Sequence, residues 1–237
     1  MSDLCLQVAG EEIHLLPERA LFWPRGDMLV AADLHWGKAA TFRAAGIPIP
    51  GGTTSSDLAR LDTALDRTGA RRLVVLGDLF HARAGRVATQ TVADLRRWRR
   101  LRTELEILLV RGNHDRHAGD PPDHLRINCV NAPAFIPPFI LRHEPHEAAA
   151  GYTLAGHVHP GLVLAGPGLQ RERLPCFIFG ARLAVLPAFG SFTGLVSVDL
   201  VGGERLFIVA EDEVVPVGEA GVCQPPLMPP LVSPPRL

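Results

Sequence analysis

The chain has 237 residues, of which 47% are hydrophobic and 21% charged, and its formal net charge is -1. These values are typical of one sizeable globular domain, and no run approaches the roughly 20 apolar residues that a membrane-spanning helix needs. The balanced charge excludes a global attraction to nucleic acid, so any such binding has to be local. No secretory signal is expected at the N-terminus, and the four widely spaced cysteines fit buried, reduced thiols of a cytoplasmic protein.

The first half of the chain alternates strand-like and helix-like segments, which predicts a partly parallel sheet. Apolar runs broken by Gly, Pro and Asp predict strands within residues 4–10, 11–16, 20–24, 27–35, 71–80 and 105–110. Apolar residues at helical spacing predict one helix over 53–68 and a second over 87–103. The buried side of the second helix would carry Val92, Leu95, Trp98 and Leu101.

After Arg126 the pattern changes to short strands separated by Gly and Pro, which look mostly antiparallel. They lie within residues 127–130, 139–143, 152–157, 162–166, 176–180, 182–187, 194–200 and 205–210. We therefore expect a mixed α/β (α+β) architecture of packed sheets with helices outside, forming a single domain over residues 1–223. Residues 224–237 are rich in proline and predict an extended tail, or alternatively a docking segment.

Five polar segments follow apolar runs, each where the carboxyl end of a strand is expected. They are DLH at 33–35, GD at 77–78, GNHD at 112–115, the segment around His143, and GHVH at 156–159. Open α/β sheets place their ligand sites at this edge, and the glycine before the polar residue lets the backbone turn sharply. The five segments are therefore expected to converge on one site.

The residue types in these segments predict a metal centre. Asp, Asn and His without Cys supply oxygen and nitrogen ligands, which suit Mn, Fe, Zn or a similar divalent ion rather than a structural thiolate zinc site. Asp33 and His35 lie two residues apart at one strand end, and His157 and His159 repeat this spacing. Two metals about 3.5–4 Å apart need a bridging carboxylate, and Asp78, alone on its turn, is the natural candidate.

The order D-x-H, GD, GNHD, a lone His and GHxH resembles that of the calcineurin-like metallophosphoesterase superfamily, over Asp33 to His159. The stretches DLHWGKAATFRAAGIPIPGGTT and GDLFHAR are similar to the bacterial ligase-associated DNA damage response endonucleases within it. The resemblance implies two mixed β-sheets packed as a sandwich flanked by helices, with a dinuclear metal site at the carboxyl edges of the strands. It also implies two divalent ions, preferably manganese with iron or zinc as alternatives. The implied partners are single-stranded or structured DNA and, functionally, a DNA ligase, a helicase and a nuclease.

Carried over position by position, the resemblance also implies a role for each site residue. One metal would be held by Asp33, His35, Asp78 and His159, and the second by Asp78, Asn113, His143 and His157. His114 would stand free of both metals beside the substrate, with Asp115 orienting its ring. Lys38 and His81 follow the metal motifs closely enough to contact a substrate phosphate, but exposure to solvent or a local hydrogen bond would equally account for them.

Two cations sharing a water would acidify it, so that a metal-bridging hydroxide attacks phosphorus in line near neutral pH. His114 would then protonate the leaving oxygen as a general acid, or stabilise the developing charge. The expected function is a metal-dependent phosphodiesterase, a DNA endonuclease of DNA repair. The alternatives are a phosphomonoesterase, including a nucleotide or cyclic-nucleotide phosphatase, and a non-catalytic scaffold.

Other histidines and a run of arginines are weaker candidates. His143 ends an apolar run and is preferred as a ligand over His146, which falls in the following loop. No chemistry is expected of His14, His117 or His124. The run 94–105 concentrates five arginines on one short helix, which could follow a nucleic-acid backbone or form a solvated face. Trp98 shares the apolar stripe of this helix and is expected in the core.

Overall fold

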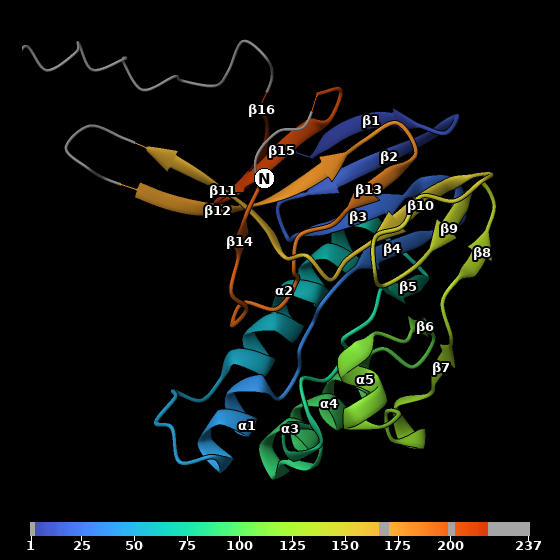
Figure 1. Cartoon of the computed structure of the whole chain (residues 1–237). Coiled ribbons are helices and arrows are strands. Elements are labelled where there is room, and N and C mark those ends of the chain that lie inside the picture. Colours follow the sequence, from blue (N-terminus) through green and yellow to red (C-terminus); the bar gives the residue numbers. More distant parts are fainter. Residues whose placement is uncertain (1–2, 166–170, 199–201, 218–237) are drawn as a thin grey trace, which may run out of the picture.

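A computed structural model describes residues 3–165, 171–198 and 202–217, and the N-terminal half of the chain forms a seven-stranded sheet in chain order (Figure 1). Its strands are β1 (Leu4–Val8), β2 (Glu11–Leu16), β3 (Ala20–Trp23), β4 (Met28–Ala31), β5 (Arg72–Val75), β6 (Glu106–Val110) and β7 (Ile127–Val130). Strands β1 to β4 are antiparallel neighbours, whereas β4 to β7 run parallel. The parallel strands are joined by helical crossovers, as parallel pairing requires. The predicted partly parallel sheet is therefore present.

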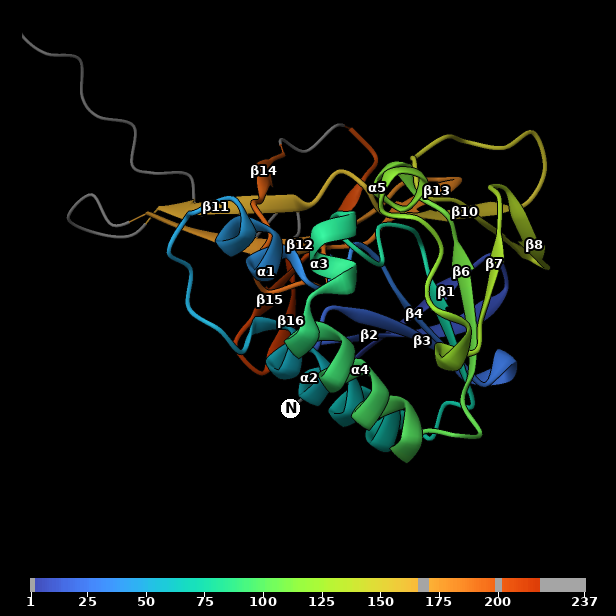
Figure 2. The same cartoon turned by 90° about the horizontal axis from the view of Figure 1, so that it is seen from below.

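The crossovers contain the helices of the described chain. They are α1 (Lys38–Ala44), α2 (Thr53–Thr68), α3 (Arg83–Val87), α4 (Thr89–Leu101) and α5 (Asn113–Ala118), with the 3-10 turn η2 (Asp123–Leu125). A second 3-10 turn, η1 (Pro24–Gly26), joins the antiparallel strands β3 and β4. Figure 2 shows α2 and α4 side by side. None of the described helices has the length and apolarity that crossing a bilayer demands.

Helix α4 differs in one respect from its predicted pattern. Leu95 and Trp98 are buried as expected, but Leu101 is 73% exposed. Leu101 is the last residue of α4, and the buried position near this end belongs to Arg99. The guanidinium of Arg99 donates hydrogen bonds to the backbone carbonyls of Leu125 and Arg102, which satisfies its buried donors. The prediction that Leu101 lies on the buried side was therefore wrong.

The second half of the chain forms a nine-stranded sheet. Its strands are β8 (Ala134–Ile136), β9 (Phe139–Leu141), β10 (Tyr152–Ala155), β11 (Pro160–Ala165), β12 (Arg171–Phe179), β13 (Leu183–Val185), β14 (Val196–Ser197), β15 (Arg205–Ala210) and β16 (Glu213–Val217). The order is β14-β11-β12-β13-β10-β9-β8, and β15 pairs with β12 and with β16. Most pairs are antiparallel, as predicted, but β10 runs parallel to both β9 and β13, and β11 runs parallel to β14. The strands β9 and β10 therefore end at the same edge.

The two sheets pack face to face, and the helices cover the outer face of the first sheet (Figures 1 and 2). One core lies between the first sheet and its helices, with Leu61 and Trp98 among its buried residues. A second core lies between the sheets and joins Leu21 of β3 to Phe177 of β12. Each fully buried side chain of this size contributes about 1.5–3 kcal/mol. The predicted fold class, two mixed sheets packed as a sandwich flanked by helices, is confirmed.

The proline-rich segment and the cysteines were also the subject of predictions. The proline-rich segment 224–237 and Cys223 lie outside the described residues. Of the three described cysteines, Cys176 is buried, Cys129 is half-buried and Cys5 is exposed, and all three are free thiols. Cys5 lies on β1, the edge strand of the first sheet, so the expectation that it is buried was wrong.

Candidate metal centre

The carboxyl ends of the parallel strands bring the predicted polar segments to one place. Parallel register pairs Ala31 of β4 with Val75 of β5, and Val74 of β5 with Leu108 of β6, so these strands end level. In the second sheet, Leu141 of β9 pairs with Leu154 of β10. The segments after all five strands therefore meet where the two sheets face each other.

One group of side chains gathers around Asp33, just after β4. Asp33 Oδ1 lies 3.4 Å from His159 Nε2, which in turn lies 3.4 Å from His35 Nε2. His35 Nε2 lies 3.9 Å from Asp78 Oδ2. The structure thus brings together the four residues predicted to hold the first metal.

A second group gathers around His143, just after β9. His143 Nε2 lies 2.8 Å from Asn113 Oδ1, 3.0 Å from His157 Nδ1 and 3.5 Å from Asp78 Oδ1. These are the four residues predicted to hold the second metal. Asp78 presents Oδ2 to the first group and Oδ1 to the second, which is the position that a bridging carboxylate occupies.

The donor atoms of the second group fit a cation. His143 Nδ1 donates a hydrogen bond of 2.9 Å to the Leu76 carbonyl, so in the neutral ring Nε2 carries a lone pair. This lone pair faces Asn113 Oδ1, which is also an acceptor. Asp33 Oδ1, between the two groups, is buried and has no hydrogen-bond partner among the described residues. Acceptors in mutual contact and an unpartnered carboxylate oxygen are satisfied by a shared divalent cation.

The protonation of two residues bears on this fit. Burial, with smaller contributions from His159 and Lys38, lowers the pKa of His35 to about 2, so its ring is neutral and needs to lose no proton to bind a metal. Burial raises the pKa of Asp78, because desolvation disfavours its charged form. A cation beside Asp78 would favour the ionised carboxylate, and metal binding at this site therefore releases protons when Asp78 starts protonated.

The backbone is strained at the candidate ligands. Ten described residues other than glycine have a positive φ, and five of them are ligand candidates. These five are Asp33 (55°), His35 (47°), Asp78 (54°), His157 (71°) and His159 (52°). A non-glycine residue in this region costs on the order of 1–2 kcal/mol, and such strain is concentrated at functional sites. The surrounding sheets therefore hold these side chains in an orientation that the backbone would not adopt by itself.

The glycines of the motifs meet two different requirements. Gly77 has a φ of 80°, as the predicted sharp turn demands. At Gly112, a Cβ atom would lie 2.3 Å from Asp78 Oδ1, and at Gly156 it would lie 2.6 Å from Asp33 Oδ2. Neither of these two glycines has a positive φ. They are therefore required because carboxylates of the site occupy the space of a side chain, which the sequence does not reveal.

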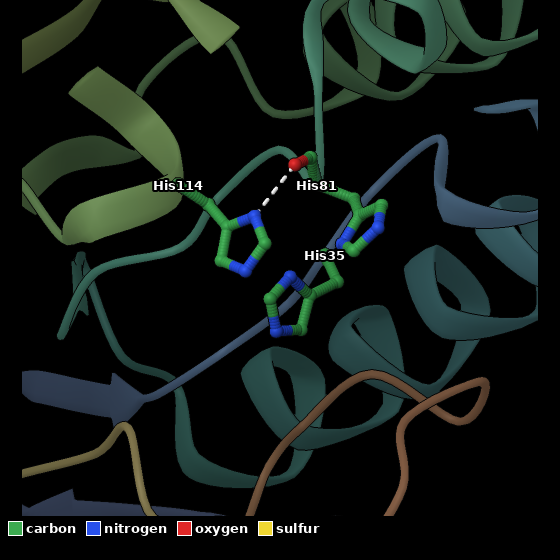
Figure 3. Close-up of side chains that lie close together, drawn as sticks. All are labelled: His35, His81 and His114. Atoms are coloured by element: carbon green, nitrogen blue, oxygen red, sulfur yellow. Dashed lines mark hydrogen bonds between the residues drawn. The ribbon is translucent and has the colours of Figure 1, made fainter. Parts of the chain in front are cut away.

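His114 lies beside both groups. Its Nδ1 donates a 2.7 Å hydrogen bond to the backbone carbonyl of His81 (Figure 3). Its Nε2 lies 4.0 Å from Asp78 Oδ2. The carbonyl fixes the proton on Nδ1 and orients the ring, so Nε2 faces the site.

The predicted role of Asp115, orienting the ring of His114, was wrong. The Asp115 carboxylate is buried and accepts hydrogen bonds from the backbone N–H groups of Asp78 (2.8 Å), Leu79 (3.0 Å) and Gly112 (2.9 Å). Neighbouring helical residues point in different directions, so Asp115 turns back toward the start of α5 while His114 faces the site. Asp115 is a positioning residue for the Asp78 turn.

His81 and Lys38 lie next to His35 and His114. The rings of His81 and His114 stack with centroids 4.7 Å apart, and the ring of His35 lies 5.4 Å from that of His81 (Figure 3). Burial, with a smaller contribution from Lys38, lowers the pKa of His81 to about 4. Burial also lowers the pKa of Lys38, whose ammonium lies 5.9 Å from the centre of the Phe192 ring. A phosphate contact of these two residues remains a prediction.

The other histidines lie as the sequence predicts. His143 is buried in the site, whereas His146 is exposed. His117 is exposed, and its Nδ1 lies 2.9 Å from the Asn113 carbonyl. His124 is exposed and lies on η2, and His14 pairs with Glu12 on β2. Of these histidines, only His143 belongs to one of the two ligand groups.

Fewer arginines of the run 94–105 are free to contact nucleic acid than the sequence indicates. Trp98 is a core residue and donates a 2.9 Å hydrogen bond to Asp62. Arg99 is buried, and Arg102 forms 2.7 Å ion pairs with Asp62 and Asp66. The exposed members are Arg96, Arg97 and Arg100. Two of the five arginines therefore serve the fold.

Two aromatic residues near the site were not predicted from the sequence. The rings of Phe42 on α1 and Phe192 meet edge to face, with centroids 5.7 Å apart, and Phe42 also lies 6.0 Å from His81. Phe192 belongs to the loop after β13, which reaches the site because Gly190 N donates a 3.1 Å hydrogen bond to the Asp33 carbonyl. Only the pairing of distant segments reveals this contact.

Known proteins resemble the chain in sequence and in fold. The model of the calcineurin-like phosphoesterase family matches residues 27–174. The chain is similar to the crystal structure of Pseudomonas putida nuclease MPE, with 40% identity and a TM-score of 0.79, over 91% of this chain and 100% of that one. YfcE, a phosphoesterase from E. coli, is 12% identical with a TM-score of 0.38, over 79% of this chain and 96% of YfcE. No curated protein sequence matches the chain.

Proposed function

The chain belongs to the calcineurin-like phosphoesterase family, and we propose that it is a metal-dependent phosphodiesterase that cleaves DNA internally, as an endonuclease of DNA repair. The observation that carries this proposal is its 40% identity, over 91% of its length, to a protein described as a nuclease. The ligand groups around Asp33 and His143 support it, because together they offer one complete donor set for each of two cations. The family match also confirms the resemblance found in the sequence motifs.

In the proposed site, Asp33, His35, Asp78 and His159 hold one divalent ion, and Asp78, Asn113, His143 and His157 hold the other. The donor set of oxygen and imidazole nitrogen suits manganese, with iron or zinc as alternatives. Bound ions of this kind supply an acidified water as nucleophile and neutralise the phosphate oxygens. The chain itself supplies the geometry, since its strained turns and sheet edges fix the eight donor positions before substrate arrives.

His114 is the proposed general acid. Its Nδ1 proton is engaged by the His81 carbonyl, so a second proton has to reside on Nε2, which faces the site. That Nε2 proton can pass to the leaving oxygen of the phosphodiester as the bond to phosphorus breaks. His81 and Lys38, on the same side, are proposed to contact the substrate phosphate.

The aromatic pair Phe42 and Phe192 favours a nucleic-acid substrate over a small phosphomonoester. Both rings are only partly buried, and the Lys38 ammonium lies beside Phe192. Aromatic rings combined with a cation form the kind of surface on which bases of a single strand stack. A phosphate ester without bases gains nothing from such a surface.

The test uses purified protein, stripped of metal and reloaded separately with Mn, Zn, Fe or Mg. Each preparation is offered single-stranded DNA, bis-nitrophenyl phosphate and mono-nitrophenyl phosphate. We expect manganese-dependent cleavage of DNA and of the diester. Hydrolysis of the monoester with intact DNA would favour the phosphatase, and no hydrolysis of any substrate by any metal form would favour the scaffold. Genes for a DNA ligase, a helicase and a nuclease beside this one would support the proposed association.

A further inference from the structure

A pocket of about 210 Å³ opens beside the second ligand group. One of its walls is formed by Gly112, Asn113 and His143, so it is continuous with the candidate metal centre. Neither the polar motifs nor the proposed chemistry accounts for the other charged residues that line it, most of which are basic.

The basic residues that line the pocket are Arg111, Arg116, Arg142 and His146. Glu144 is the one carboxylate among the described residues that line the pocket. Arg111 is neutralised, because it forms a bidentate ion pair with Asp120 at 2.7 Å. A basic surface with one lining carboxylate attracts an anion.

Two of the guanidinium groups have no counter-ion in the described chain. No described residue forms an ion pair or hydrogen bond with the side chain of Arg116 or Arg142. The Nε atom of Arg142 is moreover buried without a hydrogen-bond partner. A buried donor without a partner destabilises the fold unless a ligand or water accepts its hydrogen bond. The donors of a guanidinium group match the oxygens of a phosphate in geometry.

We propose that this pocket binds the phosphate adjacent to the scissile one in a single nucleic-acid strand, with Arg116 and Arg142 as its contacts. The inference rests on the proposed function, since Asn113 and His143 would hold the ion that engages the scissile phosphate. The next phosphate of the same strand then falls within reach of α5 and of the residue before His143. A small ester has no second phosphate and leaves the pocket unused.

The first measurement is binding by metal-free protein. A fluorescein-labelled oligothymidylate is titrated by fluorescence anisotropy at several salt concentrations, with wild type, Arg116→Gln and Arg142→Gln. Each variant is expected to bind about tenfold more weakly, and the negative slope of log K against log salt is expected to become shallower by about 0.7. Arg97→Gln, which removes an exposed arginine of α4, is the matched control and is expected to keep the wild-type slope. Arg142→Lys retains a point charge and is also expected to keep it.

The second measurement is the ratio of kcat/KM for single-stranded DNA to kcat/KM for bis-nitrophenyl phosphate, with manganese-loaded protein. This ratio is expected to fall about tenfold in Arg116→Gln and Arg142→Gln, and to stay at the wild-type value in Arg97→Gln. Unchanged salt slopes, or an equal fall on both substrates, would overturn the subsite and assign the arginines a general electrostatic role. If wild-type protein leaves DNA intact, the proposed function fails, whatever the variants do; if it cuts DNA and the variants match it, only the subsite fails.

Discussion

The Asp115 carboxylate accepts a 2.8 Å hydrogen bond from the backbone N–H of Asp78, although the two residues lie 37 positions apart in the sequence. The same carboxylate holds the amides of Leu79 and Gly112. One buried acid therefore locks the turn that carries the proposed bridging ligand to the turn that carries the proposed ligand Asn113. This relationship makes Asp115 a support of the metal centre rather than a member of the reacting groups.

Asp115→Asn is expected to lower manganese affinity and kcat on every substrate by about 10- to 100-fold, the usual effect of losing a residue that orients metal ligands. The asparagine side chain has an NH₂ group in place of one carboxylate oxygen, so this donor would face backbone N–H groups that are donors themselves. Isothermal titration with manganese and assays with both nitrophenyl esters measure the two effects. Asp123→Asn changes an exposed carboxylate on η2 and is the control. Wild-type manganese affinity in Asp115→Asn would contradict this role.

His114→Ala is expected to reduce cleavage of DNA by about 10²- to 10⁴-fold, because the alkoxide leaving group of DNA needs a proton. The loss on bis-nitrophenyl phosphate is expected to be much smaller, since nitrophenolate leaves without protonation. Initial rates on the two substrates give the comparison, with His117→Ala on the same helix as control. An equal loss on both substrates would mean that His114 acts by holding the phosphate and not as an acid.

The sequence predicted the parts of the fold and site that depend on local pattern. Strand ends can be recognised from apolar runs, and polar residues after parallel strands have to share an edge, which is why the ligand candidates were found. Burial on α4 was harder, because apolar spacing cannot indicate that Arg99 would find carbonyl acceptors and that Leu101 would lie at the end of the helix.

Contacts between distant segments were not predictable from the sequence. The amides that Asp115 accepts come from two different turns, so its adjacency to His114 in sequence was misleading. Phe192 reaches Phe42 only because the loop after β13 crosses to the end of β4. That the guanidinium groups of Arg116 and Arg142 have no counter-ion among the described residues could likewise not be predicted, because it depends on the position of every neighbouring carboxylate.

The dinuclear character of the centre is tested by metal stoichiometry. Wild-type protein is expected to bind two manganese ions, and at a free concentration about 100 times Kd each site would add about 2.7 kcal/mol to the free energy of unfolding. Asp78→Asn removes the carboxylate shared by both groups and is expected to abolish most of this stabilisation. Calorimetric titration and thermal unfolding with and without a chelator measure both quantities. A stoichiometry of one in the wild type would contradict the two-ion site.

Phe192→Ala is expected to weaken the binding of single-stranded DNA by about 1–3 kcal/mol if a base stacks on this ring. Phe192→Trp keeps an aromatic face and is expected to bind as well as wild type. Phe135, 68% exposed on β8, offers a control because Phe135→Ala removes a ring of the same size from a strand of the second sheet. Anisotropy with an oligothymidylate, compared with an abasic strand of the same length, measures the effect. The difference between the two strands is expected to shrink in Phe192→Ala alone, and an equal loss for both strands would show that the ring supports the loop and not a base.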